Sequence, residues 1–131
     1  MSEEAIVKKF RKELNAGTAS LVVLGLMVSS REPLYGYQIA KLLERRAEGP
    51  LPMKQGALYP VLRSMEANGL LRSEVQPSVS APPRRYYTVT ATGRAMLRRW
   101  TGIWSDTCAF IDRVLSGLEP GGDGDEESED V

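Results

Sequence analysis

The stretch QGALYPVLRSMEANGLLRSEVQ, residues 55–76, decides the fold of this chain. In its first part, four apolar residues recur on one helical face: Leu58, Val61, Leu62 and Met65. The pair Asn68-Gly69 is a usual helix stop, and beyond it the apolar period changes to two. We therefore predict a helix within residues 55–68 and then a strand over about residues 70–76. If the helix begins near Ala57, Pro60 falls within its first turn, where proline is tolerated.

A second strand is predicted downstream of this stretch. Residues 85–90, RYYTVT, have the aromatic and β-branched composition of a strand. The segment between the two strands, residues 77–83, contains three prolines and is too long for a tight two-residue turn. We expect a hairpin with an extended loop. Tyr86 and Tyr87 should point to opposite faces of it, because side chains alternate along a strand.

Two helices are predicted at the start of the chain. Residues 3–15 have the pattern of a short amphipathic helix, with lysines and an arginine opposite the apolar side. Gly17 is expected to interrupt this helix, and Thr18 or Ser20 can cap the next one. Residues 21–28 are apolar almost all the way round, which is typical of a helix buried on several sides.

A long helix is predicted after the hairpin, capped by Thr90 or Thr92 and ending at about Leu118. Seven of its residues recur at alternating steps of three and four, as in a heptad seam: Leu97, Trp100, Trp104, Thr107, Ile111, Val114 and Leu118. At the α-helical rise this helix is roughly 38 Å long, which is more than a domain of this size can cover. We therefore expect a second copy of the chain to pack on it.

The charge is segregated along the chain. Its 131 residues include 17 Lys and Arg against 17 Asp and Glu. Seven of these acids lie in residues 119–131, so the first 118 residues carry 17 bases against 10 acids, a net charge of +7. We expect the acidic tail to be disordered, because it has nothing to bury. A basic body with an acidic tail favours a polyanionic partner.

The composition excludes several classes of function. The chain has no histidine and a single cysteine, Cys108. A disulfide framework, the common zinc sites and a His-assisted nucleophile are therefore excluded. We expect no metal, no cofactor and no catalytic residue. The longest nearly apolar run, residues 19–28, is about half of what a bilayer requires, and no basic n-region with a cleavage site precedes it. A cytoplasmic protein without a membrane partner is expected.

The order of the predicted elements is that of a winged helix-turn-helix. Residues 35–46 are predicted to form a further core-facing helix. After the N-terminal amphipathic helix, three helices therefore precede the hairpin: residues 21–28, residues 35–46 and the helix that ends at Asn68. In this fold the third helix enters the DNA major groove, and the hairpin reaches toward the adjacent backbone. The charges agree with that arrangement, because cationic or amide side chains lie near the third helix start and at the wing base.

Three separated motifs resemble the PadR family of bacterial and archaeal transcriptional regulators. They are LYGYQI at residues 34–39, GALYPVLRSMEANGLL at residues 56–71 and PRRYYTVTATG at residues 83–93. The resemblance spans roughly residues 17–100 and is to the short members in particular, whose single C-terminal helix mediates dimerisation. It implies a mainly α (α+β) fold, a winged helix-turn-helix with a long C-terminal dimerisation helix.

The resemblance and the charge pattern together give the residues that we predict to contact DNA. They are Tyr37, Lys54, Gln55, Ala57, Tyr59, Arg63, Arg84, Arg85 and Tyr86. One departure from the family pattern affects this prediction. Lys54 and Gln55 stand where many members have Ser-Pro. The helix start thus loses a serine cap and gains a cation and an amide, and operator preference does not transfer.

Trp100 and Trp104 lie one helical turn apart and face the same way. We favour packing in the core of a dimer as their role. The resemblance offers an alternative, because in some small family members aromatic residues on this helix line a pore between subunits. That pore binds flat, apolar compounds, on which paired indoles stack well. The two tryptophans are therefore candidate ligand-binding residues.

These predictions divide the chain into four parts. They are an N-terminal amphipathic helix (1–16), a winged helix-turn-helix DNA-binding domain (17–90), a C-terminal dimerisation helix (91–118) and a disordered acidic tail (119–131). We predict a homodimeric, ligand-responsive repressor that binds double-stranded DNA at a palindromic promoter site, and no enzymatic activity. The alternatives are a winged-helix protein-interaction module and a small-molecule sensor, both without DNA binding.

Overall fold

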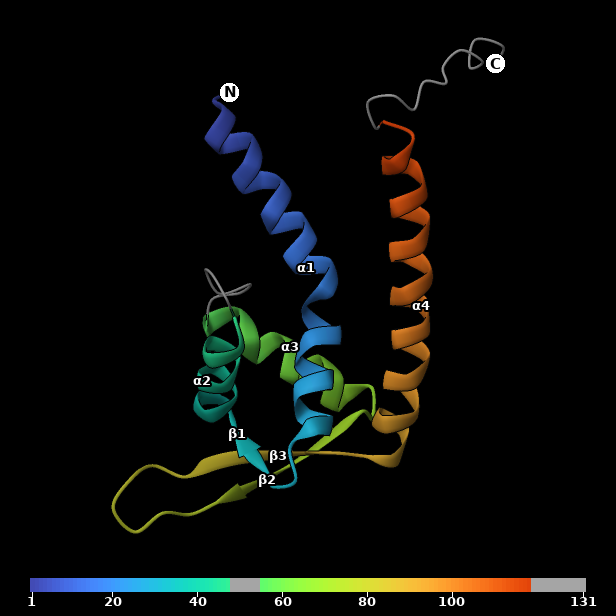
Figure 1. Ribbon diagram of the computed structural model, residues 1–131. Coiled ribbons are helices and arrows are strands. Elements are labelled where there is room, and N and C mark those ends of the chain that lie inside the picture. Colours follow the sequence, from blue (N-terminus) through green and yellow to red (C-terminus); the bar gives the residue numbers. More distant parts are fainter. Residues whose placement is uncertain (48–54, 119–131) are drawn as a thin grey trace. The chain divides into compact units, whose positions relative to one another are not determined.

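The computed structural model describes residues 1–47 and 55–118. In chain order its elements are α1 (Glu3–Ser29), β1 (Leu34–Tyr35), α2 (Gly36–Arg46), α3 (Gln55–Ala67), β2 (Leu71–Gln76), β3 (Arg84–Val89) and α4 (Ala91–Ser116) (Figure 1). The chain divides into two compact units, Met1–Leu97 and the residues from Arg98 onward. In the first unit three helices precede an antiparallel hairpin. The predicted winged helix-turn-helix is thus confirmed.

Helix α1 is continuous, so the predicted interruption at Gly17 is wrong. Its 27 residues contain both of the segments that the sequence suggested as separate helices. Gly17 has open space around it, and its penalty of about 1 kcal/mol relative to alanine does not stop a helix that is favoured on both sides. The hydroxyl of Thr18 donates to the carbonyl of Leu14 at 3.0 Å and caps no second helix. Ser2 caps α1 instead, accepting from the amide of Ala5 at 3.1 Å.

The core of the first unit forms where the C-terminal half of α1 contacts α2, α3 and β3. The apolar segment of α1 is buried on several sides, as predicted. The inner faces of α2, α3 and the sheet complete the core. Its buried residues are Val23, Leu24, Leu26, Met27, Leu34, Ile39, Leu43, Leu58, Leu62, Met65, Leu70, Leu71 and Tyr87.

Helix α3 covers the predicted segment 55–68 almost entirely, but it does not begin near Ala57, the start that would have placed Pro60 in the first turn. The helix already includes Gln55, so Pro60 lies in the second turn rather than the first. Proline has no amide hydrogen, and the exposed carbonyl of Gly56 can bond to water instead. At the other end Gly69 has φ +79°, and its amide donates to the carbonyl of Glu66 at 3.0 Å. The predicted glycine stop is confirmed.

The three strands form one antiparallel sheet in the order β1-β3-β2. β3 pairs with β2 from Leu71–Val89 to Gln76–Arg84, close to the predicted hairpin. β1 was not predicted, because two residues are too short to show a periodic pattern. It pairs with β3 through Leu34–Tyr87 and Tyr35–Tyr86. Tyr87 is buried and Tyr86 is not, so the predicted alternation of the two tyrosines is confirmed.

The start of α4 is tied to the end of α3. The hydroxyl of Thr90 accepts from the amide of Gly93 at 2.9 Å and donates to the carbonyl of Gly69 at 2.6 Å. Thr90 is therefore the cap, one of the two residues that the sequence suggested. A β-carbon on Gly93 would collide with the carbonyl oxygen of Leu70. Glycine at this position lets α4 begin directly beside the loop that follows α3.

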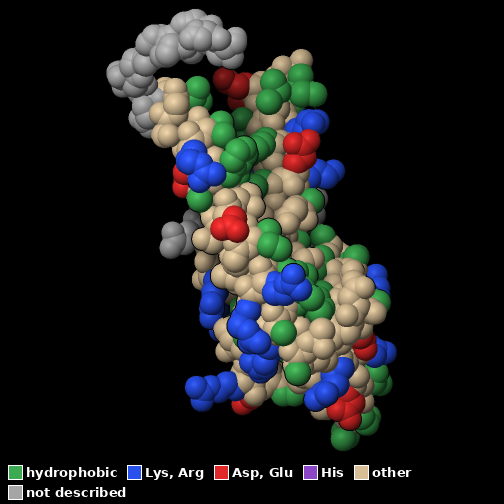
Figure 2. All heavy atoms as spheres, turned by 90° about the vertical axis from the view of Figure 1, so that its right-hand side faces the viewer, with side chains coloured by type: hydrophobic (Ala, Val, Ile, Leu, Met, Phe, Trp, Pro, Cys, Tyr) green, Lys and Arg blue, Asp and Glu red, His purple; other side chains and the backbone are tan. Residues whose placement is uncertain are grey.

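The second unit presents an apolar surface along α4. Six large hydrophobic residues of the helix are exposed: Ile103, Trp104, Phe110, Ile111, Val114 and Leu115. Figure 2 shows hydrophobic side chains at the surface of this helix. Trp104 is 41% exposed, and Trp100 and Cys108 are half-buried. The tail over residues 119–131, predicted to be disordered, lies outside the described residues. Across residues 1–47 and 55–118, none of the helices is both long and apolar enough to cross a membrane.

Candidate nucleic-acid interface

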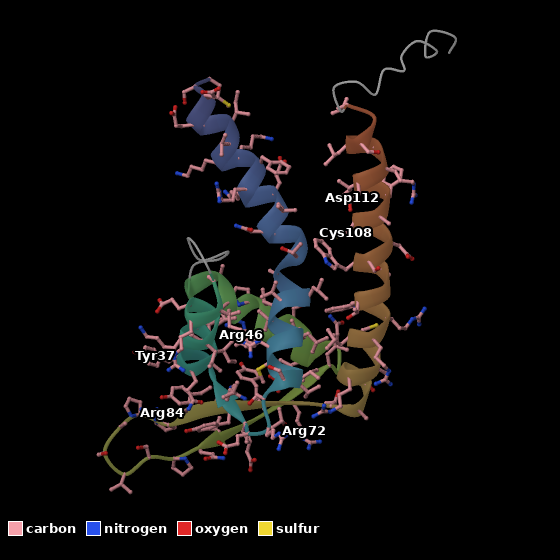
Figure 3. All side chains as sticks on the ribbon, in the orientation of Figure 1. Tyr37, Arg46, Arg72, Arg84, Cys108 and Asp112 are labelled. Carbon is pink, nitrogen blue, oxygen red and sulfur yellow. The ribbon has the colours of Figure 1, made fainter. Side chains whose placement is uncertain are left out.

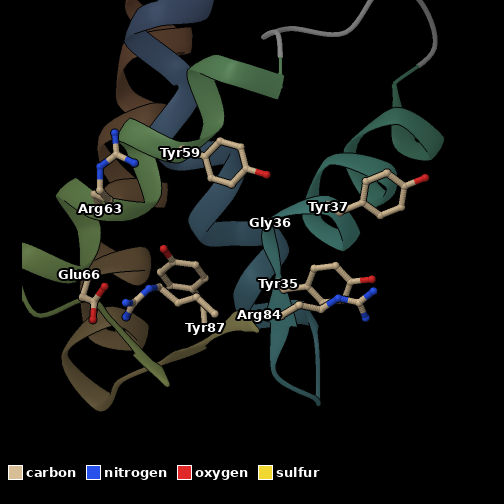
Figure 4. Close-up of a pocket in the computed structure, with 9 residues that line it drawn as sticks. Tyr35, Gly36, Tyr37, Tyr59, Arg63, Glu66, Arg84 and Tyr87 are labelled. Carbon is tan, nitrogen blue, oxygen red and sulfur yellow. The ribbon is translucent and has the colours of Figure 1, made fainter. Parts of the chain in front are cut away.

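A hollow of about 600 Å³ opens between α2, α3 and β3 in the first unit. Its lining, most of which is labelled in Figure 4, consists of Tyr35, Gly36, Tyr37, Tyr59, Arg63, Glu66, Arg84, Arg85 and Tyr87. The contribution of α3 follows from helical periodicity, because Tyr59, Arg63 and Glu66 are spaced four and three residues apart and share a face. The hollow thus combines four tyrosines and three arginines with one carboxylate.

The contact between Gly36 and Tyr59 joins α2 to α3 at the hollow. A β-carbon on residue 36 would lie 2.5 Å from Cε1 of Tyr59 and 3.0 Å from its hydroxyl oxygen. The phenol ring therefore lies directly against the first residue of α2. Tyr59 remains 37% exposed, so one side of it packs on Gly36 while the rest is open to a ligand.

Tyrosines of β1 and α2 hold two cations at the rim of the hollow. The guanidinium of Arg84 lies 4.5 Å from the ring centroid of Tyr35, and the ring of Tyr86 meets Tyr35 edge-on at 5.3 Å. The ammonium of Lys41 lies 5.5 Å from the ring centroid of Tyr37. Figure 3 shows Tyr37 and Arg84 on the same side of the unit. Each contact contributes about 0.5–1 kcal/mol at an exposed site, which favours one placement of the cation.

Arg85 has a different environment from Arg84. Its Nη1 donates to Oγ of Ser73 at 2.8 Å, and the Ser73 hydroxyl donates to Oε2 of Glu66 at 2.7 Å. These two hydrogen bonds connect β3, β2 and α3. Glu66 and Ser73 are half-buried, whereas Arg85 is exposed. The two arginines lie on opposite faces of β3, because they are adjacent in a strand.

The hydroxyl of Tyr87 lies at the centre of this charge arrangement. Burial raises its pKa above the ordinary value of 10.0, and the negative charge of Glu66 raises it further. The positive charges of Arg85 and Arg63 act in the opposite direction. Because its pKa lies above 10.0, Tyr87 is uncharged at neutral pH. It is only 4% exposed and forms a neutral part of the wall of the hollow.

Five of the nine residues predicted to contact DNA line the hollow: Tyr37, Tyr59, Arg63, Arg84 and Arg85. Ala57 is exposed on α3 but does not line it. Tyr86 lies on the other face of β3, where it lines a smaller hollow of about 240 Å³ with Arg72. Gln55 begins α3, and Lys54 lies outside the described residues.

Sequence reasoning missed four lining residues: Tyr35, Gly36, Glu66 and Tyr87. The signal for Glu66 was present, since it lies three residues after Arg63 on the same helical face. Tyr35 and Gly36 stand in the motif that supplied Tyr37. Their roles depend on β1 and on a close approach between two helices, which no local pattern reveals.

The arrangement fits recognition of phosphate groups. Arg63, Arg84 and Arg85 are all exposed, and guanidinium groups donate several hydrogen bonds in a geometry that matches phosphate oxygens. Tyrosine hydroxyls add neutral donors. Within the part of the chain that the structure describes, no group of three or more His, Cys, Asp or Glu residues could hold a metal ion.

Residues 23–99 match the sequence profile described as "Transcriptional regulator PadR-like family". The chain belongs to this family. The match covers the C-terminal end of α1, the helices α2 and α3, all three strands and the start of α4. The PadR-like chain thus carries the hollow and its lining entirely within the family domain.

Solved structures agree with this assignment. A PadR family transcriptional regulator from Eggerthella lenta is similar to this chain with a TM-score of 0.74 and 35% identity, over 86% of this chain and 94% of that one. A PadR-like transcription factor from Bacteroides fragilis is similar with a TM-score of 0.61 and 28% identity, over 84% and 98%. A protein from Lysinibacillus sphaericus, described as "Uncharacterized protein X", is 25% identical over 109 residues, 83% of this chain and 98% of its own length.

Membership in the PadR-like family confirms several predictions. The resemblance to PadR regulators and the winged helix-turn-helix fold are both correct. Transcription regulation and DNA binding are properties of the family. The family and the matched structures are regulators and not enzymes, as the composition suggested.

Proposed function

We propose that this PadR-like regulator represses transcription as a homodimer bound to a palindromic promoter site, and that it acts in the cytoplasm. The observation that carries the proposal is the hollow between α2, α3 and β3, whose lining has three exposed arginines and one carboxylate. In a winged helix-turn-helix, α3 lies in the major groove and the wing follows the adjacent backbone. The hollow lies between those two elements, where a phosphate backbone would pass.

The nine residues predicted to contact DNA would divide between backbone and base contacts. Arg63 on the exposed face of α3 can reach base edges, as can the short side chain of Ala57. From the sequence, Lys54 and Gln55 are proposed as further contacts, a cation and an amide near the start of this helix. Arg84 on β3 would neutralise a phosphate. Four further residues would add to the backbone contacts: Tyr37, Tyr59, Arg85 and Tyr86.

Selection of bound duplexes from a random DNA pool tests this proposal. We expect related half-sites about one helical turn apart. Arg63→Ala should weaken binding of the selected duplex and relax its sequence preference, by about 1–3 kcal/mol for a base contact. Arg84→Ala should weaken binding to all duplexes alike and reduce the salt dependence. Arg11→Ala, which removes the same charge from the N-terminal half of α1, is the matched control.

A gel-shift assay with the selected duplex also separates the alternative functions. A wild-type chain that does not retard any duplex at low salt would favour a protein-interaction module or a sensor. If the wild type, Arg63→Ala and Arg84→Ala bound DNA with equal affinity, these two alternatives would also be favoured. A reporter gene behind the selected site tests the sign of regulation, since its expression should rise when the regulator is absent.

The exposed apolar residues of α4 support dimerisation. Residues such as Ile111 and Val114 lie on the predicted heptad seam and are exposed in a single chain, and burying apolar surface is favourable. Sedimentation of the full chain should give the mass of two copies. Ile111→Glu should yield monomers that bind DNA more weakly, whereas Ala109→Glu, on the opposite side of the helix, should remain dimeric. A wild-type monomer would refute the homodimer.

We further propose that a planar, apolar effector binds at the tryptophans of α4 and changes DNA binding. Trp104 is exposed enough in one chain to accept a stacked ring, and Trp100 lies one turn away. An effector changes DNA binding only if it binds the two geometries of the dimer with different affinity. Tryptophan fluorescence is the readout, with planar cationic and phenolic compounds as probes. A flat response would favour simple packing of the indoles.

A further inference from the structure

The hydrogen-bonded series Arg85–Ser73–Glu66 has a fixed polarity. A guanidinium can only donate and a carboxylate can only accept. The single hydrogen of the Ser73 hydroxyl therefore points to Glu66, at 2.7 Å, and its lone pairs face Arg85, at 2.8 Å. Both ends of the series carry charge, and charge-assisted hydrogen bonds are stronger than neutral ones.

The series joins three elements of the first unit, α3, β2 and β3. Arg85 is on β3, opposite Val75 in the register, and Ser73 is its diagonal neighbour on β2. Glu66 is in the last turn of α3 and faces the hollow in Figure 4. Among residues 1–47 and 55–118, the side chain of Arg85 makes one hydrogen bond, from Nη1 to Ser73. A guanidinium has five N–H donors, so several can meet a ligand in the hollow.

We propose that Ser73 is a positioning residue that holds the guanidinium of Arg85 in one orientation for a DNA phosphate. The proposal rests on the DNA-binding function proposed above. We assign Ser73 no direct contact with DNA, because its half-buried hydroxyl is already bonded to both Glu66 and Arg85. Its hydroxyl limits the rotamers of Arg85 before DNA arrives, and a side chain that is ordered in advance loses less entropy on binding.

Arg84 provides the matched comparison. It is adjacent to Arg85 and also lines the hollow, but its guanidinium packs on the ring of Tyr35. The two arginines thus reach one hollow from two faces of β3, each held in its own way. Loss of Ser73 should therefore affect the contribution of Arg85 and leave that of Arg84 unchanged.

A double-mutant cycle with fluorescence anisotropy of a short mixed-sequence duplex tests the proposal. Ser73→Ala should weaken binding about threefold to tenfold, the range expected for one hydrogen bond. The same substitution should have no further effect in an Arg85→Ala background, and its full effect in an Arg84→Ala background. Ser73→Thr keeps the hydroxyl on a strand-favouring residue and should bind the duplex about as tightly as the wild type, unlike Ser73→Ala. Circular dichroism of each variant checks the fold.

The outcomes distinguish the two proposals. If the wild-type chain binds the duplex but Ser73→Ala binds equally well, Ser73 does not position Arg85. Additive effects of Ser73→Ala and Arg85→Ala, or failure of Ser73→Thr to restore affinity, would likewise overturn the positioning role while leaving DNA binding intact. If the wild-type chain does not bind any duplex at low salt, the proposed function is refuted and the role of Ser73 in it falls as well.

Discussion

The ring of Tyr59 lies so close to Gly36 that a β-carbon on residue 36 would come within 2.5 Å of Cε1. Gly36→Ala must therefore displace the ring, since real side chains do not approach so closely. We expect a loss of about 1–3 kcal/mol in the free energy of unfolding, as for other overpacked sites. DNA affinity should fall about tenfold, because Tyr59 leaves its place in the hollow. Chemical denaturation and anisotropy measure the two effects.

A second substitution separates the ring contact from a general effect on α2. In a Tyr59→Ala background, Gly36→Ala should cause a much smaller loss in the free energy of unfolding, because the colliding atoms are gone. Gly25→Ala is the control in the same unit, since a β-carbon there meets nothing within 4 Å. Equal losses from Gly36→Ala in both backgrounds would show that the contact with Tyr59 is not the cause.

The pKa of Tyr87 predicts how stability changes at alkaline pH. Burial and, next, the charge of Glu66 raise this pKa above 10.0 in the folded chain. The unfolded chain ionises first as the pH rises, so the contribution of Tyr87 to stability is fully present below about pH 10 and is lost above it. Tyr87→Phe should therefore lose less free energy of unfolding than the wild type over this alkaline range.

Glu66→Gln tests the second cause of that shift. Removing the carboxylate charge should lower the pKa of Tyr87, and near-ultraviolet absorbance of tyrosinate should show the earlier titration. In a Tyr87→Phe background the same substitution should leave the tyrosinate titration unchanged. An unchanged titration curve in the single variant would mean that Glu66 does not act on Tyr87.

The sequence predicted the periodic parts of the fold correctly, because burial imposes a local pattern. Spacing alone predicted the buried helical face of Leu58 and Leu62. It also predicted that Tyr86 and Tyr87 point to opposite faces of the strand. β1 was missed because two residues cannot display a period. Its pairing with β3 depends on residues about fifty positions apart, and only the folded chain brings them together.

The candidate site was predicted only in part for a similar reason. Arg63 and Arg84 were identified from charge, position and family resemblance. Glu66 and Ser73 were not identified. Glu66 shares a helical face with Arg63, but neither a carboxylate on that face nor a serine on a strand indicates by itself what it will bond to. Their role depends on a hydrogen bond between α3 and β2, and Gly36 matters only because Tyr59 lies against it.

Gly17→Ala tests why a helix break was wrongly predicted. Gly17 lies within α1 and is exposed, and a β-carbon on it would meet nothing within 4 Å. Alanine restricts the unfolded chain and favours the helix, so the free energy of unfolding should rise by about 0.5–1 kcal/mol, with more helical circular dichroism. A decrease in either quantity would indicate that α1 bends or breaks at residue 17.

Deleting residues 119–131 tests the role that charge segregation suggests for the tail. The deletion removes seven acids and no base, which changes the formal net charge per chain from zero to +7. If the tail competes with DNA for the basic body, the deletion should tighten binding to a mixed-sequence duplex roughly tenfold at low salt. The difference should shrink as salt screens it, since the screening length is about 10 Å at 0.1 M. Replacing the seven acids with Asn and Gln keeps the length and should reproduce the deletion, because the effect belongs to the charge. If both variants bound DNA with the affinity of the wild type, the tail would not compete with DNA.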